Sequence, residues 1–333
     1  MLFVHSRRAK FVLIDRALLA ERWTIRDRYQ PGRWGNPLGA LVDVARSDLV
    51  FGWFASWHTF WPIVFARLLR RPSILIVGGF DTANMPEIGY GLQRGRLTRR
   101  LVQFVTRSAG TVVTNSHASQ REIEANMGLP AARVTVLYHG VPDPYGTLPT
   151  ATRERLALTV GVVVRANLER KGLRRFVEAA AHAPDVRFVL VGSGDADLLS
   201  ELRAGAPPNV HLTGWVPDAD LDSLYRRASA YVQVSRHEGF GLAVAEAMVG
   251  GCVPVVSRAG ALPEVVGEAG VILADDAPER IAAAVRATLA APIEDRARAR
   301  DRVLTEFPLE KRRAGLWSLV DAALARSTRA GHS

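Results

Sequence analysis

Short apolar stretches alternate with longer amphipathic stretches through the first half of the chain. The short stretches are rich in valine, leucine, isoleucine and phenylalanine, which is typical of strands buried on both faces. The longer stretches read as helices. The expected strands are 2–4, 48–51, 73–77, 111–114 and 134–137, and the expected helices are 11–22, one ending at Arg70, and 119–126. This alternation predicts an α/β domain whose parallel sheet is covered by helices on both faces.

A polar segment that contains three prolines, residues 141–150, interrupts this pattern. The alternation then restarts, with a helix expected after Gly172. The expected strands of the second half are 158–164, 186–191, 210–213, 231–234, 253–256 and 271–273. We therefore expect one domain over residues 1–145 and another over 146–306, both doubly wound. Facing domains of this kind would bind a ligand in the cleft between them, because loops at the carboxyl ends of parallel strands collect there.

Composition agrees with two ordinary globular domains. The chain has 333 residues, of which 48% are hydrophobic and 23% charged, so disorder is not expected. The single cysteine, Cys252, excludes an intramolecular disulfide and favours a reducing compartment. Its apolar neighbours predict a small buried residue on a strand.

No membrane-crossing or secretory segment is expected. At the N-terminus a short apolar strand precedes the basic residues, which is the reverse of a secretory signal. The longest uncharged run, residues 51–66, is shorter than the roughly 20 residues of a spanning helix. We expect a cytoplasmic protein, with the inner face of the cell membrane as a further location.

A net charge of +10 favours anionic partners without choosing among them. Residues 93–107 form a basic amphipathic helix, in which Leu97, Leu101 and Phe104 make the apolar stripe. Tryptophans and phenylalanines crowd residues 51–61. Both segments are explained by packing on the sheet of the first domain, and both also suit peripheral contact with an anionic membrane that carries a lipid-linked acceptor.

Two glutamates, Glu238 and Glu246, flank a glycine turn that follows a strand and opens a helix near Gly241. Backbone N–H groups at such a helix start favour an anion. The Glu238 carboxylate lies on the approaching loop, where it can accept hydrogen bonds from sugar hydroxyls, and both glutamates can face one polyhydroxylated ligand. Taken singly, each glutamate is explained equally well as a solvated surface acid.

A second polar cluster, residues 164–172, follows the first strand of the second domain and is expected to be a loop. Arg165 offers a fixed fork of donors for phosphate oxygens and Lys171 a mobile point charge. Together they can hold a diphosphate and neutralise it as it leaves. The neighbouring arginines, Arg170, Arg174 and Arg175, are expected to be exposed.

Together these segments resemble glycosyltransferase family 4, whose members are retaining enzymes of the GT-B fold. Glu238 and Glu246 match the paired-glutamate motif of the family, and Arg165 and Lys171 match its diphosphate-binding pair. Further segments resemble the family in the same order, namely 189–194, 212–218, 261–266 and 307–313. The resemblance covers residues 155–325 strongly. It also implies that residues 307–333 form a C-terminal helix returning to the N-terminal domain.

The resemblance implies a role for each matched residue. Glu238 and the backbone of Gly239, Phe240, Gly241 and Leu242 would contact the donor sugar, Glu246 would hold the ribose, and Val216 would line the nucleobase pocket. A hexose would pass from a nucleoside-diphosphate sugar to a hydroxyl of a saccharide or lipid-linked acceptor, in cell-surface polysaccharide or glycolipid synthesis. The departing diphosphate would deprotonate the acceptor, so no nucleophile is assigned and no cofactor is expected.

The N-terminal domain matches the family less well. A glycine-rich loop is expected after the first strand, but Ser6 and two arginines stand there, and Ser6 is our candidate for a donor contact. Asp81 follows two glycines after the strand 73–77 and is the candidate for a catalytic, acceptor-side residue pointing into the cleft. A capping role in the turn is the alternative for Asp81. His117 precedes a helix and is left outside the set.

Two Asp-x-Asp pairs, 195–197 and 218–220, resemble a metal-binding motif of another glycosyltransferase class. Each pair precedes a helical stretch, where aspartates cap backbone amides. We expect helix capping and no essential metal.

Two other functions compete with the transferase. A nucleotide-sugar epimerase on the same fold would need its own acid and base, and a sugar phosphorylase would need a longer chain. A basic protein that binds membrane or nucleic acid without catalysis would not explain Arg165, Lys171, Glu238 and Glu246 together, and no nucleic-acid motif is present.

Overall fold

The computed structural model describes residues 1–32, 35–147 and 153–330, and the side chains up to Ser327. It contains two compact units, residues 1–140 with 309–333, and residues 141–308. We call them the N-terminal unit and the C-terminal unit. The domain limits expected from the sequence lie a few residues from these. The last three residues of the expected polar linker, 148–150, lie outside the described residues.

The N-terminal unit is built on a parallel sheet of six strands in the order β2-β1-β3-β4-β5-β6. Its strands are β1 Leu2–His5, β2 Arg26–Tyr29, β3 Val50–Trp53, β4 Ser73–Ile76, β5 Thr111–Thr114 and β6 Val134–Val136. Its helices are α1 Lys10–Ala20, α2 Pro37–Ala45, α3 Trp57–Leu68, α4 Arg96–Ser108, α5 His117–Met127 and α14 Leu309–Ala330.

Alternate side chains of the central strands enter two different cores. In β4, Leu75 packs with residues of α3, α4 and α5, whereas Ile74 and Ile76 pack with residues of α1 and α14. Because successive strand side chains point to opposite faces, a sheet covered on both sides needs apolar residues at nearly every position. This confirms the α/β prediction from the short apolar runs.

Two elements of this unit were not predicted from the sequence. Strand β2 has the sequence Arg-Asp-Arg-Tyr, and as an edge strand it leaves three of its four residues exposed, so it carries no apolar signal. Helix α2 begins at Pro37 after an Asn36 cap, which accepts a hydrogen bond from the Gly39 N–H at 3.0 Å.

Helix α4 confirms the predicted basic helix but turns a different face to the core. The buried side chains are Val102, Val105 and Thr106, whereas Leu97 is 69% exposed and Phe104 50% exposed. The helix packs against α3, and the Phe104 ring lies 5.7 Å from the Phe60 ring of that helix. Leu101 packs against the core as predicted, whereas the rest of the predicted stripe lies on the surface. The neighbouring valines cover the sheet instead.

The aromatic run of residues 51–61 divides between core and surface. Phe51 and Trp53 are fully buried on β3, as core packing predicts, while Phe60 and Trp61 are half-buried on α3 and contact each other edge to face at 5.0 Å between ring centroids. The basic helix and the half-buried aromatic side chains are therefore neighbours.

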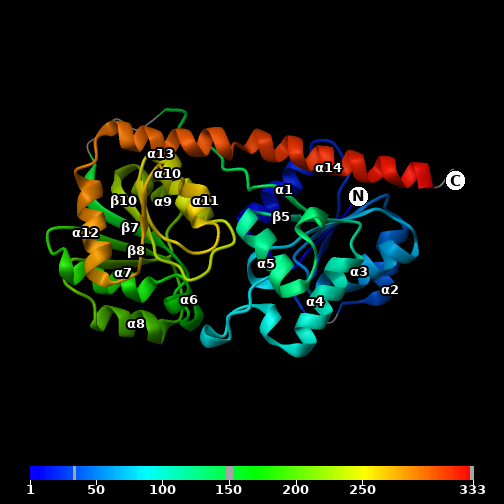
Figure 1. Cartoon of the computed structure of the whole chain (residues 1–333), viewed down its shortest axis with the longest axis horizontal. Helices are drawn as coiled ribbons and strands as arrows, with labels where there is room; N and C mark the ends of the chain where they lie inside the picture. Colours follow the sequence, from blue (N-terminus) through cyan, green and yellow to red (C-terminus); the bar gives the residue numbers. More distant parts are fainter. Residues whose placement is uncertain (33–34, 148–152, 331–333) are drawn as a thin grey trace. The chain divides into compact units, whose positions relative to one another are not determined.

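The final helix, α14, belongs to the N-terminal unit and lies alongside α1 (Figure 1), which confirms the predicted return of the C-terminal helix. A buried ion pair joins the two helices. The Arg312 Nη2 donates to Asp15 Oδ2 at 2.5 Å and its Nε to Oδ1 at 2.9 Å, and Arg312 also donates to the carbonyl of Leu137 at 2.6 Å. Both side chains are excluded from solvent.

The C-terminal unit has a second parallel sheet of six strands, in the order β12-β11-β10-β7-β8-β9. Its strands are β7 Glu154–Val160, β8 Arg187–Val191, β9 Val210–Gly214, β10 Ala228–Gln233, β11 Val253–Ser257 and β12 Val271–Leu273. Its helices are α6 Arg165–Arg170, α7 Leu173–Ala179, α8 Ala196–Ala204, α9 Asp218–Arg227, α10 Leu242–Val249, α11 Leu262–Val266, α12 Pro278–Leu289 and α13 Ile293–Glu306. In Figure 1 the labelled strands of this sheet lie between α7 with α12 and α9 with α10.

Two details of the C-terminal unit differ from the prediction. The strand expected over 158–164 runs from Glu154 to Val160, because its first two residues, Glu154 and Arg155, are charged and carry no apolar signal, and Gly161 ends the regular pairing. The expected loop 164–172 contains the short helix α6. Cys252 is buried as predicted, directly before β11, and burial raises the pKa of its thiol to about 12.

No helix among the described residues is long and apolar enough to cross a membrane.

Candidate functional site

The matched residues of the C-terminal unit meet where its strand order reverses. The chain proceeds from β7 outward to β8 and β9, then returns to place β10 on the other side of β7. Loops after the two central strands diverge at such a switch point and leave room for a ligand. The loop after β7 leads to Arg165 and Lys171, and the loop after β10 carries Glu238. The fold alone therefore brings these segments to one edge of the sheet.

The Glu238 carboxylate is held by a side chain from the end of β10. Its Oε2 accepts a hydrogen bond of 2.7 Å from Gln233 Nε2, and the side chain is 17% exposed. The Tyr231 hydroxyl lies 3.4 Å from the other amide atom of Gln233, Oε1. The second carboxylate oxygen, Oε1, has no partner among the described residues. Glu238 is thus oriented by one oxygen and available through the other.

Two cations stand beside this carboxylate. Lys171 Nζ and Arg170 Nη1 each lie 4.0 Å from Glu238 Oε2, which is too long for a hydrogen bond. Burial lowers the pKa of Lys171, and the nearby Glu238 opposes this shift. Because Glu238 makes no direct hydrogen bond to Lys171, the ammonium keeps its donors for an anionic ligand.

Arg170 was expected to be exposed, and the structure contradicts this. The side chain is 9% exposed and its Nη2 donates to Asn167 Oδ1 at 2.9 Å, while Nη1 donates to the His237 carbonyl at 3.3 Å. Its own carbonyl accepts from the Arg236 N–H at 2.7 Å. Arg170 therefore clamps α6 to the Glu238 loop. Arg175 is exposed as expected, whereas Arg174 is partly covered.

The turn that aims Lys171 at the site requires glycine. Gly172 has φ +66°, and a Cβ there would lie 2.3 Å from the Val234 carbonyl oxygen. Only glycine combines this left-handed conformation with such a close approach to β10. Gly172 therefore allows the loop that carries Lys171 to lie close to the loop that carries Glu238.

Arg165 is the first residue of α6, after the short loop 161–164 that follows β7, and its side chain is exposed. The structure therefore places it at the same sheet edge as Lys171, with access to solvent.

The glycine turn after Glu238 starts helix α10 as predicted. Gly241 caps the helix with φ +104°, and Leu242 is its first residue. Gly239 and Leu242 are half-buried, whereas Phe240 is buried and packs edge to face on Phe307. Phe240 therefore contributes its backbone alone to this turn.

Glu246 lies on α10 and is half-buried. Burial raises the pKa of Tyr145, Tyr225 and Tyr231, and the charge of Glu246 adds to each of these shifts. Val216 is half-buried in the segment after β9, at the same sheet edge.

Asp195 caps helix α8, because its Oδ1 accepts from the backbone N–H of Asp197 at 3.1 Å and of Leu198 at 3.2 Å. Asp218 and Asp220 lie in the first turn of α9. Helix capping, which we predicted for both pairs, is confirmed for Asp195. For the second pair it is wrong, because the N-cap of α9 is Pro217 and no side chain caps this helix, although both aspartates are placed favourably for the helix dipole. Within residues 1–32, 35–147 and 153–330, no group of three His, Cys, Asp or Glu side chains is arranged to hold a metal ion.

Ser6 lies at the corresponding switch point of the N-terminal unit, directly after β1, and is half-buried. The following arginines pack over aromatic rings, Arg7 at 6.0 Å from the centroid of Phe54 and Arg8 at 4.7 Å from that of Tyr29. The structure therefore places Ser6 and Asp81 in one unit and the remaining candidates in the other.

Asp81 does not point into open space. It is 1% exposed, and its two carboxylate oxygens accept from the N–H groups of Ala55 and Gly78, each at 2.9 Å. Burial raises its pKa to about 7 despite these hydrogen bonds. The geometry is that of the capping alternative: Asp81 ties the turn after β4 to the residues that follow β3.

The residues that orient Glu238 were missed in the sequence. Gln233 is a buried amide in an otherwise apolar strand, and Arg170 is one of five basic residues within 165–175. A polar residue at the carboxyl end of a central strand indicates a functional site, and Gln233 is such a residue. Nothing in the sequence separates Arg170 from its exposed neighbours.

Two family models match the chain. One, described as glycosyl transferases group 1, matches residues 155–291, and the other, described as glycosyl transferase 4-like domain, matches residues 15–140.

Curated relatives of the chain are named as mannosyltransferases or glycosyltransferases. O-antigen chain mannosyltransferase B of Escherichia coli is 33% identical over 181 residues, which is 50% of this chain and 48% of the relative. D-inositol 3-phosphate glycosyltransferase of Segniliparus rotundus is 30% identical over 239 residues, or 62% of this chain and 53% of the relative. The chain thus spans about half the length of these curated relatives.

Solved structures show the same fold across nearly the whole chain. Anabaena Alr3699/HepE in complex with UDP superposes with a TM-score of 0.76 at 18% identity, covering 96% of this chain and 98% of that one. WaaG, a glycosyltransferase involved in lipopolysaccharide biosynthesis, gives a TM-score of 0.68 at 14% identity, covering 95% and 97%. The two matched models, the two six-stranded parallel sheets and these neighbours establish that the chain belongs to glycosyltransferase family 4 and has the GT-B fold.

Proposed function

We propose that the chain is a retaining glycosyltransferase that moves a hexose from a nucleoside-diphosphate sugar to a hydroxyl of a saccharide or lipid-linked acceptor. The observation that carries this proposal is the pairing of Lys171 with Glu238 at the switch point of the C-terminal unit, 4.0 Å apart and not directly hydrogen bonded. One residue is a cation free to bind phosphate, and the other is a carboxylate free to accept from a sugar hydroxyl.

Charge stabilisation of the leaving group is the main catalytic contribution we assign to the chain. Breaking the bond between the hexose and the diphosphate leaves negative charge on the phosphate oxygens. Lys171 and Arg165 stand at the sheet edge where that charge develops, and a partly desolvated cation stabilises it more strongly than one in water. Arg170 holds the Glu238 loop in place without being exposed itself.

Glu238 positions the donor sugar. Gln233 fixes one carboxylate oxygen, so the other presents a defined acceptor to a hydroxyl. The N–H groups at the start of α10 add donors beside it, and Glu246 on the same helix takes the ribose. In the retaining reaction that we propose, the departing diphosphate accepts the proton of the acceptor hydroxyl on the same face of the sugar.

The cations also give the site a metal-free way to neutralise the diphosphate. We expect that transfer needs no divalent metal, and that activity is the same with and without a chelator.

The identity of the nucleotide-sugar donor is the first property to determine. One relative is named as GDP-mannose-dependent and the HepE structure holds UDP, so the relatives do not agree on one base. We expect one of the UDP-, GDP- or dTDP-sugars to raise the melting temperature of the protein and to be turned over, both in excess EDTA. Stabilisation by none of them would contradict the assignment of the C-terminal unit as a donor site.

We propose that the acceptor is brought to the enzyme at an anionic membrane surface, at the inner face of the cell membrane. The contact surface consists of the exposed residues of α4, namely Arg96, Leu97, Arg99, Arg100 and Phe104, continued by Phe60 and Trp61 of α3. Exposed apolar side chains between arginines suit the boundary between headgroups and acyl chains.

We expect salt-sensitive co-sedimentation of the protein with vesicles that contain anionic lipid, and weak binding to neutral vesicles. Exchanging both Leu97 and Phe104 for serine should abolish it, because these side chains are exposed and contribute little to the core. A matched control is Ile293→Ser, which removes an exposed apolar side chain from the C-terminal unit. Equal binding of all three proteins would refute the membrane surface.

A further inference from the structure

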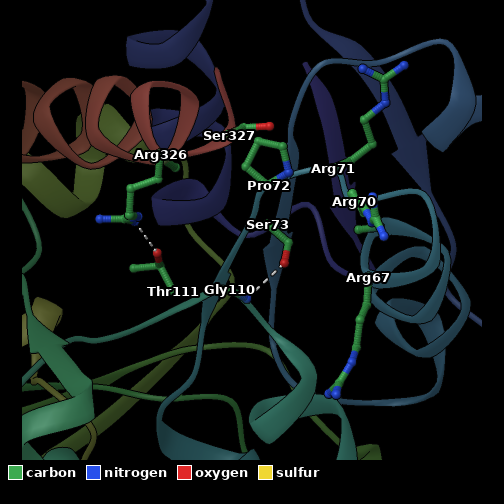
Figure 2. A pocket seen from close by; sticks show the side chains of 11 residues that line it. Arg67, Arg70, Arg71, Pro72, Ser73, Gly110, Thr111, Arg326 and Ser327 are labelled. Atoms are coloured by element: carbon green, nitrogen blue, oxygen red, sulfur yellow. Dashed lines mark hydrogen bonds between the residues drawn. The ribbon is translucent and has the colours of Figure 1, made fainter. Parts of the chain in front are cut away.

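A basic groove crosses the N-terminal unit at the amino ends of β4 and β5. It is a cavity of about 450 Å³ between the end of α3, the start of β4 and the last described turns of α14. Figure 2 shows the first residues of β4 running between Arg326 on one side and the arginines that follow α3 on the other. The lining residues used below, which we call the arginine groove, are Arg67, Arg70, Arg71, Ser73, Thr111 and Arg326.

The groove lies at the opposite end of the sheet from the other candidate residues of this unit. Ser73 and Thr111 begin their strands, whereas Ser6 follows the carboxyl end of β1 and Asp81 lies beyond that of β4. In a parallel sheet these ends are on opposite edges. The arginine groove is therefore separate from the acceptor side assigned to this unit.

Positive charge in the groove is uncompensated. Four arginines line it and no aspartate or glutamate does. Within the part of the chain that the structure describes, none of the four forms an ion pair. Their hydrogen bonds within these residues go to neutral oxygens, from Arg71 Nη2 to the Ala45 carbonyl at 3.3 Å and from Arg326 Nη2 to Thr111 Oγ1 at 2.9 Å. Like charges gathered on one concave surface attract an anion strongly.

Arg70 adopts a backbone conformation that is uncommon for residues other than glycine. Arg70 has φ +53°, the left-handed conformation that ends many helices and strongly favours glycine. The turn is held by the Arg71 N–H, which donates to the Ala66 carbonyl at 2.8 Å. Glycine would adopt this conformation at lower free energy, so an arginine here costs stability. Backbone outliers of this kind concentrate at functional sites.

A second cavity extends the groove along the sheet edge. It measures about 390 Å³, shares Gly110, Thr111 and Arg326 with the first, and adds Arg133 and Thr135 without any acidic residue. Cations are therefore spread along an elongated surface together with hydroxyl donors. Guanidinium groups bind phosphate oxygens in pairs, so a row of them suits several linked phosphates better than one carboxylate.

We propose that the arginine groove binds a ligand with two or more linked phosphates, at a site distinct from the donor site of the C-terminal unit. The ligand connects α14, through Arg326, to the end of α3, through Arg67 and Arg70. Both a soluble polyphosphate and the headgroup of a lipid diphosphate have this chemistry.

The test compares three variants, and a combination of two of them, with the wild-type full chain. Arg70→Gly with Arg326→Gln removes two cations from the groove, and the glycine relieves the left-handed strain, so this variant should fold. Lys171→Ala weakens the donor site alone. Arg280→Gln is the control, since it removes an exposed cation from the C-terminal unit.

With tripolyphosphate as probe in isothermal titration, the wild type, Arg280→Gln and Lys171→Ala should each retain a saturable site. The groove variant should lose this site, so that its combination with Lys171→Ala binds roughly tenfold more weakly than Lys171→Ala alone or not at all. In a second arm, vesicles carrying a polyprenyl diphosphate replace tripolyphosphate. Groove-dependent binding in the first arm identifies a soluble source, and in the second arm alone a lipid source. Equal binding by the groove variant and the wild type in both arms, or a site lost only with Lys171→Ala, would overturn the proposal, whereas loss of donor turnover alone would leave it standing.

Discussion

Replacing Glu238 by glutamine should lower the rate of hexose transfer by roughly a hundredfold or more, which corresponds to about 2.7 kcal/mol or more of lost transition-state stabilisation. Glutamine has nearly the same shape but no charge, and it offers an N–H₂ group where the site presents an acceptor. The amide oxygen of the new glutamine could still accept the hydrogen bond from Gln233 Nε2. The position that accepts from the sugar hydroxyl in the wild type would then hold the N–H₂ group. The rate is measured as nucleoside diphosphate released at saturating donor and acceptor.

The control for this variant is Glu169→Gln. Glu169 is exposed on α6 and its ion pairs among the described residues are with the surface side chains of Arg174 and Arg236, so the same chemical change is made outside the pair of Lys171 and Glu238. It should keep turnover within about twofold, because exposed ion pairs contribute little. Thermal melting of both variants separates loss of catalysis from loss of folding. Wild-type turnover in Glu238→Gln would remove the carboxylate from the mechanism.

Replacing Asp15 by alanine should lower the free energy of unfolding by about 3–5 kcal/mol. The change leaves the Arg312 guanidinium buried with only backbone carbonyls as partners, and both side chains are excluded from solvent. Because the pair joins α1 to α14, the loss should appear as earlier unfolding of the N-terminal unit. Urea denaturation followed by tryptophan fluorescence measures it, since Trp317 on α14 donates to the Leu18 carbonyl of α1.

A second variant tests the cause of that loss. If the uncompensated charge is responsible, Asp15→Leu combined with Arg312→Met should recover most of the stability, because an apolar pair of similar volume has no charge to desolvate. The matched surface pair is Arg22 with Asp321, which also joins α1's end to α14 but is about half exposed. Asp321→Ala should cost less than about 1 kcal/mol. An equally small loss for Asp15→Ala would contradict the buried-pair account.

The strands were predictable because a parallel sheet covered on both faces needs an apolar residue at nearly every strand position. Phe3, Ile74 and Val113 enter one core while their neighbours enter the other, so each strand reads as an apolar run. Strand β2 has no such run, because it lies at the sheet edge and is largely exposed. The prediction of which face of α4 is buried was wrong for a related reason. Spacing locates an apolar stripe, but in the structure Val102 and Val105 are buried, whereas Leu97 and Phe104 are exposed.

The parts of the site that belong to recognisable motifs or follow the ends of strands were predictable from the sequence. Glu238, Arg165 and Lys171 lie at the carboxyl edge of one sheet, because the strand order brings the loops after β7 and β10 together. The sequence did not reveal that Arg170 is buried under the Glu238 loop, since its neighbours have the same charge. Nor did it distinguish a capping aspartate at Asp81 from one facing a ligand, because that depends on the position of the Ala55 N–H, 26 residues earlier in the chain.

Affinity for the nucleoside diphosphate is the measurement that tests the central assignment most directly. The nucleotide whose sugar stabilises the protein should bind the wild type in isothermal titration in excess EDTA. Lys171→Ala should weaken that binding by at least roughly tenfold, because a partly buried cation is lost from the diphosphate. Arg174→Ala, which removes a nearby cation of the next helix, should leave it unchanged. Equal affinity in the wild type and Lys171→Ala would contradict the proposed donor site.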